Sequence, residues 1–394
     1  MGAHRQGRRA PRRGRARRAR PERVLSGESI LITGGAGFIG SHLADTLLAQ
    51  GHRVRALDDL TPQVHGTVDR PAYLAADVEL VRGDVRDVEA VSRALDGVDS
   101  VVHLAARVGV GQSMYEIADY VSANSTGTAV LLQALAERPV RKVVVASSMS
   151  IYGEGLYRAD GRVVVPQPRT REQLERDEWE PRGPDGERLE PAPTPETKEP
   201  DLASVYALTK YDQERLCLVF GSAYGVPVVA LRLFNVYGTR QALSNPYTGV
   251  LAIFASRLLN GNAPLVFEDG LQRRDFVSVH DVARAFALAL ERDDANGLAV
   301  NIGSGESVTV LELAAQLAAT IGTEIEPEIS GASRAGDIRH CFADIALARE
   351  TLGFEPRQTL AEGMREIAGW LEGQVASDRV DEAAAELRRR GLTL

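Results

Sequence analysis

Residues 29–40 read S-I-L-I-T-G-G-A-G-F-I-G, and this stretch decides the fold. Three apolar residues at 30–32 predict a short buried strand, three glycines follow at a spacing of three, and a helical pattern begins directly after them. In such a unit Gly34 permits a tight turn, Gly37 lets the backbone approach a pyrophosphate, and Gly40 lets helix and strand pack closely. The stretch therefore predicts a phosphate-binding turn, and a loop that needs glycine only for flexibility is the alternative.

The residues after this turn extend it into a dinucleotide site. Residues 38–50 have helical apolar spacing, and residues 53–57 predict a second strand that ends at two aspartates. Asp58 lies 18 positions beyond Gly40, close to where an acid that binds the adenosine ribose of NAD is expected. A carboxylate there repels the 2′-phosphate of NADP, so the sequence favours NAD. The cofactor-binding candidates of this unit are Gly34, Gly37, Phe38, Ile39, Gly40, Asp58 and Asp59.

Short β-branched runs alternate with helical patterns from residue 24 to about residue 150, which is typical of right-handed βαβ units around a parallel sheet. The predicted fold class is therefore α/β, a doubly wound parallel sheet of the Rossmann type with a smaller mixed α/β substrate-binding domain on its C-terminal side. Strands are expected at 29–33, 53–57, 78–81, 100–103 and 142–147, and helices at 117–138, 205–224, 307–321 and 359–373.

Shifts in composition predict the domain organisation. We expect a disordered basic tail at 1–23, an NAD-binding domain at 24–235, a substrate-binding region at 236–376 with some strands returning to the main sheet, and a C-terminal helix at 377–394. Residues 154–200, rich in proline and charge, form an insertion that is either a surface hairpin or a lid, and composition favours the hairpin. The pattern at 378–390 predicts an exposed, charged helix.

Charge and cysteine content limit the possible partners. Residues 1–23 carry ten arginines and one acid, whereas the whole chain has a net charge of −8, so the rest of the chain is strongly acidic. An acidic body argues against nucleic acid as a partner, and the tail has no aromatic side chain to stack on bases. No segment approaches the roughly 20 apolar residues of a membrane span. Two distant cysteines without a C-x-x-C pattern argue against a disulfide scaffold or a metal site and fit a reducing cytoplasm.

Tyr206 and Lys210 stand four apart at the start of a predicted helix, which places them on one face. A phenol with a pKa near 10 is a poor base, but an ammonium beside it and a positive nicotinamide above it would stabilise the phenolate. Ser148, at the end of a predicted strand, could hydrogen-bond the same substrate hydroxyl. Each residue alone has a plainer structural reading. Together with a dinucleotide turn, the three predict proton-coupled hydride chemistry, with Ser148, Tyr206 and Lys210 as catalytic residues.

Five motifs, in order, carry a family resemblance: T-G-G-A-G-F-I-G, H-L-A-A at 103–106, N-S-T-G-T from Asn124, S-S-M-S-I-Y-G, and Y-A-L-T-K. Over about residues 29–370 the chain resembles the extended short-chain dehydrogenase/reductase family, in particular its nucleotide-sugar 4-epimerase branch. The resemblance gives the same catalytic set. It also implies that the cofactor is contacted by Asp84, Val85, Leu104, Ala105, Ala106, Asn124, Tyr206 and Lys210.

The second half of the chain supports the same branch. By the resemblance, Asn235, Arg274 and Arg334 would bind the diphosphate of a UDP- or dTDP-sugar, and a guanidinium fork matches phosphate oxygens. Ser148, Asp337 and Cys341 are further substrate-binding candidates. Many relatives have a bulky aromatic residue in place of Cys341, so a cysteine there would leave more room for the sugar.

Met149 and Ser150 stand where related dehydratases carry an Asp-Glu pair, so the resemblance to an epimerase is greater than that to a dehydratase. The long insertion and the segment 240–250 resemble those of the subgroup of epimerases whose assigned substrate is dTDP-L-rhamnose. We therefore expect an NAD-dependent enzyme that inverts C4 of a nucleotide sugar, dTDP-L-rhamnose or a UDP-hexose, through a transient 4-keto sugar.

Two kinds of alternative stay open. One is a dehydratase, 4-ketoreductase or dehydrogenase acting on nucleotide sugars with the same scaffold. The other is a catalytically silent NAD-binding regulator that touches nucleic acid through its tail, although a silent protein would be expected to lack the Tyr or the Lys. The resemblance further implies a homodimer that pairs through the helices near 117–138 and 205–224.

Overall fold

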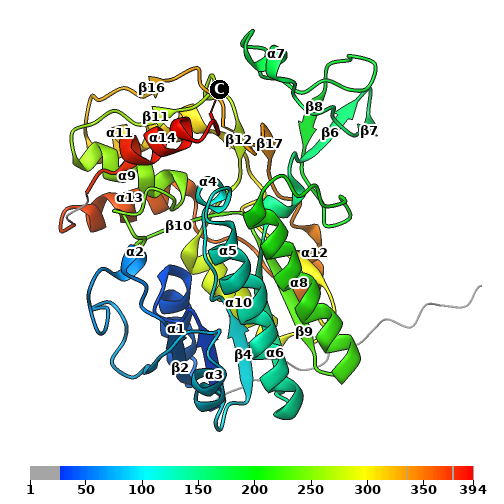
Figure 1. The fold of residues 1–394 in the computed structure, drawn as a ribbon, viewed down its shortest axis with the longest axis vertical. Coiled ribbons are helices and arrows are strands. Elements are labelled where there is room, and N and C mark those ends of the chain that lie inside the picture. Colours follow the sequence, from blue (N-terminus) through cyan, green and yellow to red (C-terminus); the bar gives the residue numbers. More distant parts are fainter. Residues whose placement is uncertain (1–26, 335, 375–376, 394) are drawn as a thin grey trace, which may run out of the picture.

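The computed structural model describes residues 27–334, 336–374 and 377–393. The basic tail predicted at 1–23 lies outside these residues. The described part contains a seven-stranded sheet in the order β14-β9-β5-β4-β1-β2-β3, in which every ladder is parallel. The sheet lies in the lower half of the molecule as drawn in Figure 1. Its strands are β1 Ser29–Thr33, β2 Arg53–Asp58, β3 Glu79–Arg82, β4 Ser100–His103, β5 Lys142–Ser148, β9 Val228–Leu233 and β14 Ala299–Ile302.

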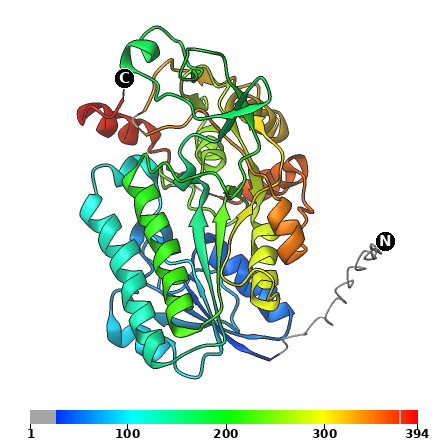
Figure 2. The ribbon, with the colours of Figure 1, turned by 90° about the vertical axis from the view of Figure 1, so that its right-hand side faces the viewer.

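Helices cover both faces of this sheet (Figure 2). Ile30 and Ile32 of β1 pack into a core on one face, whereas Leu31 packs into a separate core on the other. One face is covered by α1 Phe38–Ala49, α10 Val279–Glu291 and α12 Ala346–Leu352, and the other by α3 Val88–Ala94, α6 Gly127–Glu137 and α8 Val205–Tyr224. Strands buried on both faces explain the continuous apolar runs of the sequence. The predicted doubly wound α/β fold is confirmed.

The winding of the chain locates a binding crevice. From β1 the chain winds to one side through β2 and β3, and it then crosses to the other side through β4, β5 and β9. In open parallel sheets ligands bind where the winding reverses, at the carboxyl ends of the strands. Here that point lies between β1 and β4, next to the glycine turn.

The helix predicted at 117–138 is divided into α5 Ile117–Tyr120, a π-helical turn Val121–Thr126, and α6. The turn buries the side chain of Asn124, which accepts a hydrogen bond from the backbone N–H of Arg107 at 2.7 Å and donates to Thr209 Oγ1 at 2.9 Å. Single π turns within helices often occur at functional sites. The apolar pattern gave no sign of the turn because its stripe falls on α6.

The second half of the chain surrounds its own apolar core with three helices, α9 Val250–Leu259, α11 Val310–Ile321 and α13 Leu360–Leu371. β14, from the same half, joins the main sheet. None of the helices in the described part combines the length and the hydropathy of a bilayer span. The small strands of this half are β10 Asn235–Tyr237, β11 Leu265–Val266, β12 Arg273–Arg274, β13 Phe276–Ser278, β15 Val308–Thr309, β16 Glu328–Ile329 and β17 His340–Cys341.

The insertion at 154–200 forms a three-stranded antiparallel sheet that stands at the surface beside the second half (Figure 1). Its elements are β6 Leu156–Ala159, β7 Arg162–Val164, β8 Glu190–Ala192 and the short helix α7 Arg171–Leu174. It thus has the form of a surface hairpin, the alternative that composition favours.

Arg339, a fully buried arginine, connects this insertion to the second half. Its guanidinium lies 2.7 Å from Glu180 of the insertion, 2.9 Å from Glu268 and 2.6 Å from Asp269. Arg169, also from the insertion, lies 2.7 Å from Glu268 and donates to the carbonyl of Asp337 at 3.1 Å. We call these five charged side chains, Arg169, Glu180, Glu268, Asp269 and Arg339, the Arg339 network.

The C-terminal helix α14, Val380–Arg389, corrects an expectation. The sequence predicts an exposed helix, but Ala384 and Leu387 are 8% and 6% exposed. The charged residues that dominate its composition lie on the other faces. One face of α14 is therefore packed against the protein.

Candidate active site

The first of two adjoining cavities begins at the glycine turn between β1 and α1. Gly34 has φ of +70°, and a Cβ there would lie 2.9 Å from the backbone nitrogen of Ala105. The first turn of α1 has Gly37 as its N-cap and no capping side chain, which leaves the helix N-terminus open to an anion. A turn that admits only glycine and an uncapped helix fit the pyrophosphate of NAD. The predicted cofactor residues that line this cavity are Gly34, Gly37, Phe38, Ile39, Gly40, Asp58, Asp59, Asp84, Val85, Leu104, Ala105, Ala106, Tyr206 and Lys210.

The two aspartates at the end of β2 differ in their surroundings. Asp58 is buried, and its oxygens accept hydrogen bonds from the backbone N–H groups of Ala36 and Leu60, each at 3.0 Å. Asp59 is more exposed, and partial loss of solvent around its carboxylate, followed by the neighbouring Asp58 charge, raises its pKa. Asp58 therefore holds the glycine turn in shape, and Asp59 adds a second carboxylate to the cavity wall.

Two other predicted cofactor residues have structural partners. Asp84 pairs with Arg86, and hydrogen bonds from Arg86 lower the pKa of Asp84. Asn124 is fully buried and does not line the cavity, although its neighbour Ala123 does. Asn124 accepts a hydrogen bond from the backbone N–H of Arg107 and donates one to its carbonyl at 3.1 Å. It therefore positions the backbone of Arg107, which lines the cavity, without lining the cavity itself.

The predicted catalytic set converges at the inner end of the cavity. Tyr206 lies in the first turn of α8, whose N-cap Ser204 accepts a hydrogen bond from the N–H of Ala207 at 3.1 Å. Burial raises the pKa of the Tyr206 phenol, and its hydrogen bond with Ser148 opposes that rise. Ser150 donates to Ser148 Oγ through both its hydroxyl, at 2.9 Å, and its N–H, at 3.2 Å. The Ser148 proton is therefore directed away from Ser150.

Lys210 lies one helical turn after Tyr206 and is buried at 4% exposure. Burial lowers the pKa of its ammonium to about 8, so the group is mostly charged at neutral pH. Its Nζ donates to Gln213 Oε1 at 2.6 Å. In this arrangement Ser148 is the group that opposes the effect of burial on the Tyr206 pKa, and a lowering of that pKa by Lys210 stays a prediction.

Gln213 is a residue that the sequence reasoning missed. Its amide nitrogen lies 2.9 Å from Thr128 Oγ1 and 3.2 Å from His103 Nε2, while its oxygen holds Lys210. Burial and then the Lys210 charge lower the pKa of His103 to about 3, so this imidazole is neutral. A polar residue three positions after Lys210 on an otherwise packed helix face was the available signal.

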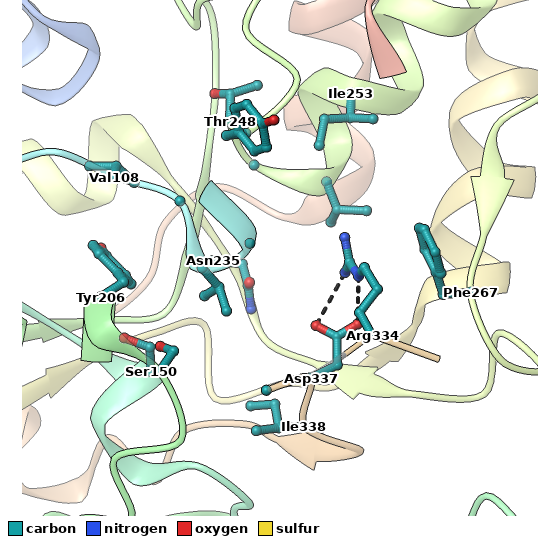
Figure 3. A pocket seen from close by; sticks show the side chains of 18 of the residues that line it. Val108, Ser150, Tyr206, Asn235, Thr248, Ile253, Phe267, Arg334, Asp337 and Ile338 are labelled. Carbon is teal, nitrogen blue, oxygen red and sulfur yellow. Dashed lines mark hydrogen bonds and ion pairs between the residues drawn. The ribbon is translucent and has the colours of Figure 1, made fainter. Parts of the chain in front are cut away.

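The second cavity, of about 390 Å³, adjoins the first, and Ser148 and Tyr206 line both. Figure 3 shows Tyr206 and Ser150 at one side of it and Arg334 and Phe267 at the other, with Asn235 between. We call the end with Ser148 and Tyr206, the predicted catalytic residues, the reactive end of this elongated pocket, and the end with Arg334 its cationic end. No residue of the insertion is among those that line it.

Most predicted substrate residues lie in this second cavity. Asn235, Arg274, Arg334 and Asp337 line it. Arg334 Nε donates to Asp337 at 2.8 Å, and its guanidinium lies over the ring of Phe267 at 4.3 Å (Figure 3). Arg274 donates to the carbonyls of Ile338 and Arg339. Both arginines therefore line one cavity, and a pair of guanidinium groups matches the oxygens of a diphosphate.

Cys341 is the exception among the predicted substrate residues. It does not line either cavity, is 1% exposed, and its thiol lies 3.8 Å from Thr194 Oγ1. The expectation that this cysteine widens the sugar pocket is wrong, because β17 turns the side chain towards the base of the insertion. Within the described residues no group of His, Cys, Asp and Glu is placed to hold a metal ion.

The fold and these two cavities define an enzyme of the extended short-chain dehydrogenase/reductase class. The family model described as the NAD dependent epimerase/dehydratase family matches residues 30–303. The chain therefore belongs to that family, and its cofactor is NAD.

Known proteins of similar sequence and structure agree. The dTDP-L-rhamnose 4-epimerase of Burkholderia thailandensis is 37% identical, over 88% of this chain and 96% of that protein. The UDP-glucose 4-epimerase of Thermotoga maritima, solved with UDP-glucose, has a TM-score of 0.71 and 32% identity, over 87% of this chain and 98% of that chain. The Thermus thermophilus enzyme of the same name, in complex with NAD, has a TM-score of 0.69 and 32% identity, over 88% and 100%.

Proposed function

We propose that this enzyme inverts C4 of a nucleotide sugar, with dTDP-L-rhamnose as the first candidate substrate and UDP-hexoses as the second. The observation that carries the proposal is that Ser148 and Tyr206 line both the dinucleotide cavity and the elongated cavity with its two arginines. A sugar C4 held beside Tyr206, with its diphosphate on Arg274 and Arg334, would stand next to the cofactor. The Burkholderia thailandensis relative supports dTDP-L-rhamnose.

Tyr206 is the proposed base for the 4-hydroxyl of the sugar. The Ser148 proton points away from Ser150, so it can reach either the phenol oxygen or the substrate hydroxyl and relay a proton between them. NAD, when bound, supplies the site that accepts the C4 hydrogen with its electron pair and later returns it. Lys210, fixed by Gln213, keeps a cation one turn below the phenol. A 4-keto sugar that turns over within the cavity would then receive hydrogen on its other face.

The neighbours of Ser148 weigh against a dehydratase. Met149 is buried, and Ser150 is committed to Ser148. Neither side chain supplies a carboxyl group for the removal of water across C5 and C6. The intact Tyr206 and Lys210 likewise weigh against a silent regulator.

A substrate panel tests which sugar is used. We expect kcat/KM of the purified protein to be highest for dTDP-L-rhamnose and at least tenfold lower for UDP-glucose and UDP-galactose. The measurement is the initial rate of C4 inversion for each sugar at equal enzyme concentration. Equal or reversed values would contradict the choice of sugar while leaving C4 inversion intact.

The two carboxylates at the end of β2 are proposed to select NAD over NADP. Asp59→Asn removes one negative charge from the cavity and spares the bonds of Asp58 to the glycine turn. We expect the ratio of the NADP and NAD dissociation constants to fall about tenfold, because like charges a few ångströms apart repel by about 1–4 kcal/mol. Asp69→Asn, at a side chain that is 98% exposed, is the control. An unchanged ratio in Asp59→Asn would refute this role.

A homodimer is proposed through the outer surface of α5 and α8. Apolar side chains are exposed there, among them Ile117, Leu208 and Val219, which are 51%, 51% and 58% exposed. Leu208 and Val219 lie three turns apart on one face of α8, so a second copy could cover them together.

A cytoplasmic location also stays a prediction.

Val219→Asp tests this surface. We expect the wild-type protein to sediment at twice its chain mass of 42.5 kDa and the variant at the chain mass, because a charge would be buried in the interface. Val163→Asp, on β7 and equally exposed at 58%, should remain a dimer. Analytical ultracentrifugation gives the answer, and a dimeric Val219→Asp would place the interface elsewhere.

A further inference from the structure

α14 forms part of the wall of the substrate cavity. Val380, Ala383, Ala384 and Leu387 line that cavity together with Leu392, which follows the helix. The lining is apolar, although α14 as a whole is rich in charge. A helix whose buried face borders a ligand cavity, rather than only a packed core, is a candidate contact for that ligand.

The C-terminal end of α14 packs against the segment that positions Tyr206. A Cβ on Gly111 would lie 3.5 Å from a methyl group of Leu387. Gly111 belongs to the short helix α4, Val110–Ser113, and Ser113 Oγ accepts a hydrogen bond from the N–H of Tyr206 at 3.0 Å. Arg390 lies over the ring of Tyr115 at 4.3 Å. Leu387 therefore packs on the short helix whose Ser113 holds the backbone of Tyr206, and both Leu387 and Tyr206 line the second cavity.

The N-terminal end of α14 is held by the second half of the chain. Buried Arg257 of α9 lies 2.9 Å from Asp381 and 3.7 Å from Asp378, and Asn262 donates to Asp378 at 2.7 Å. Beyond the helix, Thr393 forms a backbone bridge with Arg334. α14 thus extends along the cavity from α9 to α4, and the residues that follow it form a backbone bridge with the arginine proposed to bind phosphate.

We infer that α14 is a substrate-binding element in which Ala384 and Leu387 contact the bound nucleotide sugar and determine its affinity and selectivity. This inference rests on the proposed function, because it takes the second cavity as the nucleotide-sugar site. An apolar wall beside the reactive end accepts a sugar edge without hydroxyl groups, since a hydroxyl against it would lose its hydrogen bonds with water. The substrate class that fits is a nucleoside diphosphate linked to a deoxy sugar.

Two neighbouring alanines provide the test. Ala384→Leu adds three carbon atoms on the cavity side, and Ala385→Leu adds the same atoms on the exposed side of the same helix. Both changes cost the helix the same in propensity. We expect Ala384→Leu to raise the dissociation constant of dTDP-L-rhamnose, measured by calorimetry, about tenfold. The dissociation constant of Ala385→Leu should equal that of the wild type. Both variants should keep the NAD content and the melting temperature of the wild type.

Leu387→Ala is the second variant, and it removes wall atoms instead of adding them. We expect weaker binding of dTDP-L-rhamnose by about three- to tenfold and a smaller preference for it over UDP-glucose, because water can then reach the sugar edge. The inference is overturned if Ala384→Leu and Leu387→Ala both bind like Ala385→Leu. A wild-type protein that binds a nucleotide sugar without inverting it would contradict the proposed activity alone, and the comparison of the two alanine sites would still decide the role of α14.

Discussion

Tyr206→Phe is expected to lower kcat by about 10³-fold or more, while NAD content and melting temperature stay at wild-type values. General acid–base groups contribute roughly 10²–10⁴-fold to rates, and no other phenol shares the Ser148 hydrogen bond in the described structure. The fold should not change, because the edge-to-face packing of this ring on Tyr120, with centroids 6.5 Å apart, needs no hydroxyl group. The rate of C4 inversion under saturating sugar measures the effect.

The matched control for this variant is Tyr224→Phe at the far end of the same helix, where the side chain is 60% exposed. It loses the same oxygen atom at a site without chemistry, so its kcat should equal that of the wild type. A Tyr206→Phe enzyme with more than about a tenth of the wild-type kcat would remove Tyr206 from its role as base.

Arg339→Met is expected to lower the free energy of unfolding by about 3–5 kcal/mol, the largest stability effect that we foresee. The substitution keeps most of the side-chain volume but leaves three carboxylates, Glu180, Glu268 and Asp269, without their shared cation. Burial raises the pKa of Glu180, yet hydrogen bonds from His340 and Arg339 outweigh that effect and hold the pKa at about 2. Glu180 is therefore charged at neutral pH, and without Arg339 it keeps only His340 as a partner.

Arg349→Met is the control for this loss of stability. Arg349 pairs with Glu355, but both side chains are more than half exposed, and such a change should stay within about 0.5 kcal/mol of the wild type. Urea unfolding followed by circular dichroism gives both values. Equal losses in the two variants would show that the Arg339 network does not stabilise the attachment of the insertion.

Local patterns were sufficient to predict the core of the fold. The run at 29–33 and the helix at 205–224 coincide with β1 and α8, because an apolar run and a Ser204 cap with a left-handed Gly225 define these elements without distant contacts. The conformation of the glycine turn is likewise determined locally, because Gly34 adopts a positive φ that other residues rarely adopt. Local patterns also predicted much of the first cavity, because many of its residues follow the ends of neighbouring parallel strands.

Features that depend on distant contacts could not be predicted. Arg339 alone reads in the sequence as a surface arginine, because the three acids that pair with it lie about 70 and about 160 positions earlier, the latter in the insertion. α14 reads as exposed because charge dominates its composition, although a single face packs against the cavity. Cys341 was placed by analogy with relatives, and the direction of a two-residue strand decides where its side chain points.

The most direct test of the proposed function is proton NMR of the purified protein with dTDP-L-rhamnose and no added cofactor. We predict that the signal of the C4 proton divides into an equilibrium mixture of two C4 epimers, with no keto sugar accumulating and no reduced cofactor required. The assignment as a C4 epimerase would be contradicted if none of the dTDP- and UDP-sugars tested changes, or if a keto sugar accumulates.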